Sequence, residues 1–185
     1  MPHKNTLQLE KSALVIVDMQ EAFRQRIPDF TDIAARIAVM TRASKLLNLP
    51  ILVTEQYPKG LGYTAEEIKA ALPPEVQIIE KTSFSSCGAQ AFRKQLEHTT
   101  AKQLLVCGIE THICVNQTVH DLLVEEYQVH LLTDCVSSRE TNNRVTALGK
   151  MQMSGAIPSS VELALFELMR DAGHEQFKAI QNLVK

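Results

Sequence analysis

Cys114 is the residue of this sequence whose position best suits a nucleophilic thiol. It lies six residues after Gly108, which ends an apolar run typical of a buried strand, and a helical pattern begins near Thr111. A helix N-terminus presents free N–H groups and a partial positive charge, which favour a thiolate and lower the pKa of a cysteine. We therefore expect a reactive thiolate at Cys114.

A cation and a carboxylate follow two other apolar runs. Lys81 could stabilise the thiolate, and Asp18 could relay a proton as a general acid or base. Taken singly, an aspartate at a strand end is often a helix cap, and a lysine there is often a solvated charge. A catalytic role for these residues therefore depends on a fold that brings them to Cys114.

The remaining cysteines have different settings. Cys107 lies inside the run QLLVCG, which predicts a small buried hydrophobe. Cys87 and Cys135 could line a pocket, but neither lies in a turn that supplies clustered backbone donors, so their roles stay open. The four cysteines have no CxxC spacing, which predicts reduced thiols.

The elements that must position these side chains alternate along the chain. Apolar and β-branched runs predict strands at residues 13–17, 51–54, 76–79, 103–108, 129–134 and 156–160. Helical periodicity predicts helices at 31–49, 65–72, 88–98, from 111 onwards, and at 141–154, 161–169 and 175–184. This order predicts a single α/β domain over residues 1–185: a three-layer, doubly wound, six-stranded parallel sheet with helices on both faces.

In a doubly wound sheet, ligands bind beyond the carboxyl ends of the strands. Asp18, Lys81 and Cys114 all follow predicted strands, so we expect them to converge at one sheet edge. Glu55 follows a further predicted strand and Asp134 ends another, so both are expected at the same edge.

Charge and hydropathy restrict the partners. Nineteen basic and 21 acidic residues give a net charge of −2, and no block of Lys or Arg favours nucleic acid or an anionic membrane. No apolar run approaches the roughly 18 residues of a membrane span, and the first ten residues do not resemble a signal peptide. We expect a cytoplasmic protein that acts on a small molecule.

Several segments together resemble the isochorismatase-like cysteine hydrolases. They are VDMQ (17–20), EKTSFSS (80–86), CGIETHICVNQT (107–118) and TDCVSSR (133–139). TEQYPKGLG (54–62) and MQMSGAIPSSVE (151–162) are similar to the isochorismatase domain-containing subgroup. The resemblance covers nearly the whole chain and implies a catalytic triad of Asp18, Lys81 and Cys114.

The resemblance also implies a reaction. Cys114 would attack an amide carbonyl to give a thioester, which water then hydrolyses. It implies a cis peptide bond between Ile109 and Glu110, and an oxyanion hole formed by the backbone N–H groups of Glu110 and Cys114. Because several relatives are oligomeric, a homo-oligomer is expected as well.

The sequence departs from two branches of this family. Nicotinamidases bind a metal through an Asp-x-His pair after the second strand, where this chain has Glu55 and Gln56, so we expect no metal and no other cofactor. Isochorismatases proper cleave a vinyl ether without a nucleophilic cysteine, so Cys114 argues against that reaction. GLGYTA (60–65) matches a dinucleotide-binding pattern, but it does not directly follow the first strand.

Substrate contacts are predicted from loops at the same edge. The aromatic candidates, which could equally cover the core, are Phe23, Tyr57 and Phe84. The polar candidates are Gln20, Glu55 and His112. None of these six residues identifies a substrate.

Two other functions stay open. A protein with this fold could bind a ligand with little turnover, since fold does not imply function. A ribonuclease-type activity is the least favoured, because the charge is nearly balanced and no basic patch is evident.

Overall fold

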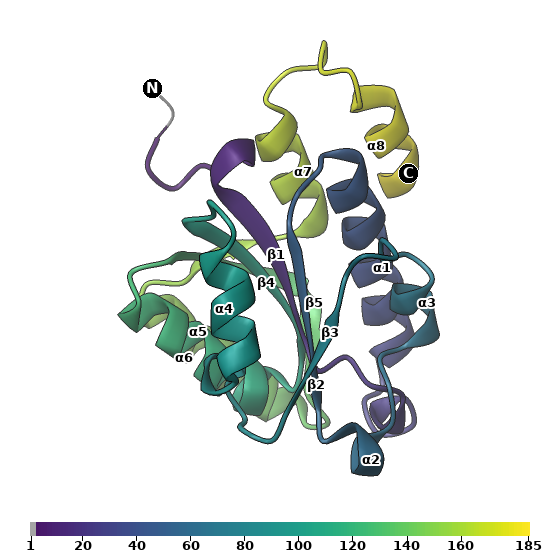
Figure 1. Cartoon of the computed structure of the whole chain (residues 1–185), viewed down its shortest axis with the longest axis vertical. Helices are drawn as coiled ribbons and strands as arrows, with labels where there is room; N and C mark the ends of the chain where they lie inside the picture. The colour runs from purple at the N-terminus through teal and green to yellow at the C-terminus, as the bar shows by residue number, and fades with distance from the viewer. Residues whose placement is uncertain (1–2) are drawn as a thin grey trace.

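A six-stranded, entirely parallel sheet forms the centre of the computed structural model, which describes residues 3–185 (Figure 1). The strands are β1 (Ser12–Val17), β2 (Ile51–Gln56), β3 (Ile78–Lys81), β4 (Gln103–Ile109), β5 (Gln128–Ser137) and β6 (Ile157–Ser159). Their order is β3-β2-β1-β4-β5-β6. The chain therefore reverses its winding direction between β1 and β4, which is where such sheets bind ligands.

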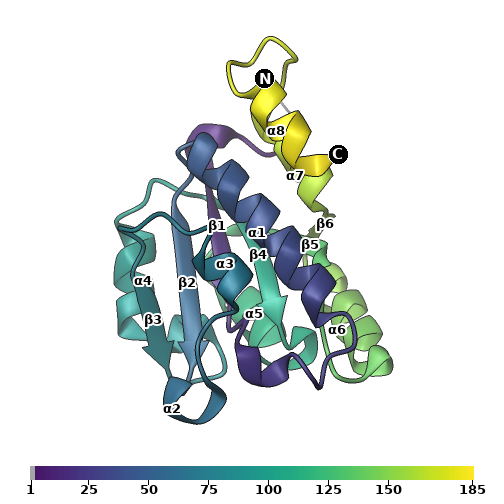
Figure 2. The same cartoon turned by 90° about the vertical axis from the view of Figure 1, so that its right-hand side faces the viewer.

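Helices cover both faces of the sheet, which confirms the predicted fold class. They are α1 (Phe30–Leu46), α2 (Pro58–Leu61), α3 (Glu66–Lys69), α4 (Gln90–Glu97), α5 (Asn116–Val124), α6 (Thr141–Met153), α7 (Val161–Met169) and α8 (Phe177–Val184). Short 3₁₀ segments lie at Leu9–Lys11, Glu21–Phe23 and Ser86–Gly88. Figure 1 shows α4, α5 and α6 on one face and α1, α3, α7 and α8 on the other, while Figure 2 shows α1 and α3 lying across the sheet.

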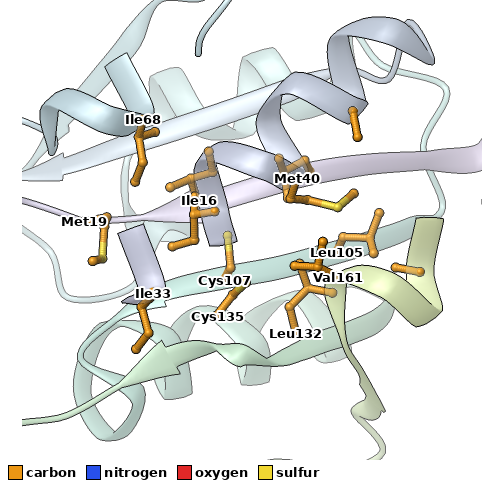
Figure 3. Close-up of a cluster of buried hydrophobic side chains, with 14 of the residues drawn as sticks. Ile16, Met19, Ile33, Met40, Ile68, Leu105, Cys107, Leu132, Cys135 and Val161 are labelled. Carbon is orange, nitrogen blue, oxygen red and sulfur yellow. The ribbon is translucent and has the colours of Figure 1, made fainter. Parts of the chain in front are cut away.

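The alternation of buried side chains along the central strands explains the two cores. Ile16 of β1 and Leu105 of β4 point toward α1, α3 and α7, in the cluster drawn in Figure 3. Val15 and Val106 point to the opposite face, toward α4, α5 and α6. Every residue of β1 and β4 is buried, as expected for strands that helices cover on both sides.

Several strand ends differ from the sequence-based predictions. β3 was expected at 76–79 but begins at Ile78, because the Val76 N–H donates to the Pro73 carbonyl in a turn before it. β2 runs on to Gln56 and pairs with β3 as far as Lys81. Glu55 and Lys81 therefore lie within strands, rather than after them.

The third predicted helix and the fifth predicted strand also differ. The helix expected at 65–72 is regular only over α3. It ends in a turn in which the Ala71 N–H donates to the Ile68 carbonyl oxygen. β5 continues to Ser137 with a register shift opposite Val106 and Gly108. Asp134 thus lies inside β5, and its carboxylate accepts the Val161 N–H at 3.2 Å at the start of α7.

Among residues 3–185, none of the helices combines the length and the apolar character that a membrane crossing needs.

Candidate active site

A small cavity opens at the carboxyl edge of the sheet, at the switch between β1 and β4. Its volume is about 100 Å³. The polar residues that line it are Asp18, Gln56, Glu110 and Cys114. The apolar ones are Phe23, Leu61, Phe84, Ile109 and Ile113. The fold therefore brings Asp18 and Cys114, which are far apart in the sequence, to one cavity.

Lys81 forms a buried ion pair with Asp18. The Lys81 Nζ lies 2.6 Å from the Asp18 Oδ2, and the two side chains are 0% and 2% exposed. The same ammonium donates to Gln56 Oε1 at 2.9 Å and to the carbonyl oxygens of Ser83 at 3.0 Å and Phe84 at 2.9 Å. Because an ammonium has three N–H bonds, these four acceptors leave it no free donor.

The Asp18 carboxylate is held on both oxygens. Its backbone has φ 51°, a left-handed conformation that is uncommon for a residue other than glycine. Thr54 of β2 donates its hydroxyl to Asp18 Oδ1 at 2.7 Å, while Lys81 occupies Oδ2. Burial raises the pKa of Asp18 above its ordinary value, and the Lys81 ammonium and the Thr54 hydroxyl offset this rise only in part.

The last residues of β4 approach β1 closely. Gly108 has φ 120°, and a Cβ placed there would lie 2.0 Å from the Val17 carbonyl oxygen of β1. The peptide bond between Ile109, the last residue of β4, and Glu110 is cis, as the resemblance implies. A single π-helical turn, Thr111–Val115, follows and runs directly into α5. Such turns are frequent at functional sites.

Cys114 lies in this π-helical turn and is 7% exposed. Burial raises the pKa of its thiol far above the ordinary value, the Asp18 carboxylate raises it further, and the Lys81 ammonium lowers it only in part. The expectation of a thiolate with a lowered pKa is therefore wrong. Desolvation and the neighbouring Asp18 carboxylate both favour the neutral thiol over the thiolate.

A second ion pair lies at the wall of the cavity. Glu110 is buried, and its Oε1 accepts the Arg139 backbone N–H at 3.1 Å and the Arg139 Nε at 3.0 Å. Glu110 raises the pKa of Arg139 further above its already high value. The pair fastens the residue after β4 to the segment after β5, because Arg139 follows Ser137, the last residue of that strand.

Of the aromatic candidates, two line the cavity. Phe23 and Phe84 are both part of its wall, and Phe84 is half-exposed at the surface. Tyr57, which is also half-exposed, instead lines a neighbouring surface groove with Thr82 and Gln90.

The polar candidates lie outside the cavity wall. The Gln20 amide bonds the backbone of Gln56 and Gly62, and Glu55 Oε1 accepts from the N–H and the hydroxyl of Thr64. Both side chains therefore hold the loop between β2 and α3 rather than contact a substrate. His112 Nδ1 lies 3.0 Å from the Ser138 hydroxyl, in the turn and away from the cavity.

Four residues of the site were missed by the sequence interpretation. Thr54 and Gln56 bond the Asp18–Lys81 pair, and Leu61 and Ile113 complete the apolar wall. Thr54 pairs with Val17 in the β1–β2 register, and Gln56 pairs with Lys81 in the β2–β3 register. These contacts become predictable only once the strand order is known.

The other three cysteines are buried free thiols. Cys107 packs in the core between the sheet and α1, as predicted (Figure 3). Cys135 lies in the same core, and Cys87 lies in the core on the opposite face. Burial raises the pKa of Cys87 to about 12, and none of the three thiols lines the cavity that contains Cys114. Within residues 3–185, no group of three or more His, Cys, Asp or Glu side chains is placed to hold a metal ion.

The chain is similar to proteins of one known family. A family model described as the isochorismatase domain matches residues 12–162. The chain belongs to the isochorismatase family. Isochorismatase domain-containing protein 2A of Mus musculus is 42% identical over 177 residues, which are 95% of this chain and 84% of that protein. The secreted isochorismatase effector Isc1 of Phytophthora sojae is 41% identical over 177 residues, or 94% of this chain and 84% of the relative.

Solved structures of the isochorismatase fold superpose closely on the chain. A protein described as MAR1 ribonuclease from Caenorhabditis elegans has a TM-score of 0.93 at 36% identity, covering 97% of this chain and 92% of its own. The YcaC gene product of Escherichia coli, described as an octameric hydrolase of unknown specificity, has a TM-score of 0.85 at 23% identity, covering 100% and 96%. At that identity, the second likeness shows the fold alone.

Proposed function

We propose that this isochorismatase-family protein hydrolyses a small amide or related carbonyl compound, with Cys114 as nucleophile and Asp18 and Lys81 as its partners. The observation that carries the proposal is the buried Asp18–Lys81 pair at the same cavity as the Cys114 thiol. A buried pair of opposite charges beside a nucleophile in a cleft is typical of a functional site.

The proposed reaction begins with a proton transfer. As the Cys114 sulfur attacks the carbonyl carbon, Asp18 takes the thiol proton, and the carbonyl oxygen becomes an oxyanion. Backbone N–H groups of Glu110 and Cys114 stabilise that oxyanion. Asp18 then gives the proton to the leaving amine as the C–N bond breaks, which leaves a thioester on Cys114. Water then hydrolyses the thioester, which releases the carboxylic acid and regenerates the Cys114 thiol.

The acid–base properties of the residues support this order of events. A thiol with a raised pKa does not ionise by itself near neutral pH, so a base must remove its proton during attack. A carboxylate with a raised pKa is a stronger base than an ordinary aspartate. Lys81 keeps that carboxylate ionised and oriented through the 2.6 Å contact.

Ammonia release from a panel of small amides tests the proposal, with wild type compared to Cys114→Ser and Cys114→Ala. We expect release by wild type and none by the variants, whose circular dichroism should match that of wild type because the change is small. Release of ammonia by Cys114→Ala at the wild-type rate would refute the nucleophile assignment.

The names of solved relatives favour testing ribonuclease activity as a second function. The net charge of −2 and the cavity of about 100 Å³ argue against it, because RNA recognition relies on cationic surfaces. Cleavage of RNA by wild type but not by Cys114→Ser would establish it. A third possibility, a binding protein with little turnover, predicts that a ligand stabilises the fold while the amide panel stays intact.

We also propose that the protein is a cytoplasmic homo-oligomer that acts without a metal or cofactor. The octameric neighbour supports the assembly, and the four free thiols are typical of a reducing compartment. One relative is named a secreted effector, so fractionation of cells that express the chain is the appropriate test of location.

A further inference from the structure

The wall of the cavity beside Cys114 is mostly apolar. Phe23, Leu61, Phe84, Ile109 and Ile113 supply five of the nine residues that line it. A charged group that enters such a wall loses hydration and receives few polar contacts in return. The wall therefore selects against charge unless an oppositely charged side chain is free to meet it.

The charged groups at the cavity are already neutralised in pairs. Asp18 is bonded to Lys81 at 2.6 Å, and Glu110 is bonded to Arg139 at 3.0 Å. None of the described residues that line the cavity is a lysine, an arginine or a histidine. Of the two basic partners, Lys81 is buried among its acceptors, and Arg139, which bonds Glu110 through Nε and has a side chain that is 47% exposed, does not line the cavity.

Lys81, the partner of Asp18, is a candidate to receive a substrate carboxylate, but its donors are in use. Its Nζ contacts Asp18, Gln56 and two backbone carbonyl oxygens, which exceeds its three N–H bonds. A substrate anion would have to displace one of these buried acceptors and leave it unsatisfied, which is unfavourable.

We propose that the substrate of this site is a small amide with an uncharged acyl group, and that carboxylate-bearing amides are excluded. This inference rests on the proposed hydrolase function and narrows it to a substrate class. The volume of about 100 Å³ corresponds to roughly three water molecules, so the acyl part that reaches Cys114 is limited to a few non-hydrogen atoms. This cavity is well below the several hundred Å³ of a site for a larger metabolite.

Two alkylating agents of nearly equal size test the effect of charge on entry to the cavity without a change of shape. Iodoacetamide and iodoacetate both form a bond from the Cys114 sulfur to their CH₂ group as iodide leaves and the thiol proton passes to a base. In iodoacetamide the CH₂ group carries an uncharged amide, and in iodoacetate it carries a carboxylate. The rate at Cys114 is measured for each reagent by mass spectrometry of the peptide, with Cys114→Ser to assign it and N-acetylcysteine as a free-thiol reference.

The expected result is a preference for the uncharged reagent. The ratio of the iodoacetamide rate to the iodoacetate rate at Cys114 should exceed the ratio for N-acetylcysteine by about tenfold or more. An equal ratio, or a preference for iodoacetate, would overturn the inference. The measurement needs no turnover, so it does not depend on finding the natural substrate.

A pair of variants tests whether the cavity wall causes the preference. Phe84→Lys places a cation at the wall, on a residue that is 54% exposed and therefore tolerates the change. It should raise the iodoacetate rate several-fold relative to iodoacetamide. Tyr63→Lys makes the same charge change on a side chain that is 65% exposed and outside the cavity wall. A response from Tyr63→Lys equal to that from Phe84→Lys would contradict a local cause.

Hydrolysis of two matched amides provides a second test of the substrate class. Malonamide and malonamate have the same number of heavy atoms and differ by one charge, and kcat/KM for malonamide should be higher by about 100-fold. Equal or faster hydrolysis of malonamate would overturn the inference while leaving the hydrolase proposal intact. Failure to release ammonia from any amide would instead refute the hydrolase proposal, even if the alkylation ratio is as expected.

Discussion

Asp18 affects Cys114 in two ways that can be separated experimentally. In the resting protein, its carboxylate raises the pKa of the neighbouring thiol. In the proposed reaction, the same carboxylate accepts the thiol proton. The first effect makes the thiol less reactive toward simple alkylating agents, while the second makes it reactive toward a bound substrate. A substitution at Asp18 therefore has opposite consequences for the two measurements.

Asp18→Asn should lower kcat by about 10²- to 10⁴-fold, because the general base is lost. It should also increase the rate of Cys114 alkylation by iodoacetamide at pH 7, since the pKa of the thiol falls when the carboxylate is removed and Lys81 remains. Asp32→Asn, an exposed residue of α1, is the control and should change neither rate. A parallel fall in turnover and alkylation would contradict the opposing effects of Asp18.

The pH dependence of turnover follows from the raised pKa of Asp18. The carboxylate is the active form, so kcat/KM should fall as the pH drops through that pKa, at a higher pH than for an ordinary aspartate. Thr54→Val removes the 2.7 Å hydrogen bond that favours the ionised form, so it should move this acid limb to higher pH. The measurement is a pH profile of kcat/KM.

Thr133→Val is the matched control for that profile. The Thr133 hydroxyl bonds the Ser159 carbonyl oxygen at 3.0 Å, on strands away from Asp18. Its profile should coincide with that of wild type. If the acid limb of Thr54→Val also stays in place, Thr54 has no influence on the ionisation of Asp18.

The sequence predicts the individual chemical groups better than their contacts. Asp18, Lys81 and Cys114 were predicted because each follows a recognisable buried run. Gln20 and Glu55 were expected at the substrate because they are polar residues at the same edge. In the structure they instead satisfy backbone N–H and carbonyl groups of a loop, a need that the sequence does not display.

Among the strands and helices, the close approach of β4 to β1 positions the site. Gly108 pairs with Val17, directly before Asp18, and has no room for a side chain. Gly108→Ala should lower the free energy of unfolding by about 2–4 kcal/mol, because the added Cβ meets the Val17 carbonyl oxygen and the φ is unfavourable. Urea unfolding measures the change.

Gly149→Ala provides the control for Gly108→Ala. A Cβ at Gly149, inside α6, has nothing within 4 Å, and alanine is the better helix former by about 0.5–1 kcal/mol. This variant should be slightly stabilised. Equal stabilities for the two variants would show that the close approach to β1 is not a constraint.

The bounds of a strand can be predicted from the sequence where both of its faces are buried. They are harder to predict where only hydrogen bonding to a neighbouring strand sets its ends. The runs of β1 and β4 are continuously apolar because helices cover both of their faces. The ends of β2 and β3 include Glu55, Glu80 and Lys81, whose polar side chains hide the strand pattern. Likewise, the π-helical turn at Cys114 spans only Thr111–Val115, which is too short to show a periodicity of its own.

Assembly is a property of the whole molecule that sedimentation equilibrium measures. The proposed homo-oligomer predicts a sedimentation-equilibrium mass that is a multiple of 20.6 kDa. Exposed Leu163 and Phe166 on α7 are apolar side chains that an interface would cover. A mass of one chain at all concentrations would contradict the assembly.

In the proposed mechanism, amide hydrolysis by the whole protein passes through a thioester on Cys114. Hydroxylamine trapping during turnover of propionamide detects this thioester, because hydroxylamine intercepts a thioester to give a hydroxamate. We predict that wild type forms propionohydroxamic acid at the expense of propionic acid, and that Cys114→Ala forms neither product. Ammonia release by wild type with propionic acid as the sole acyl product, or hydroxamate formation by Cys114→Ala, would rule out a thioester on Cys114.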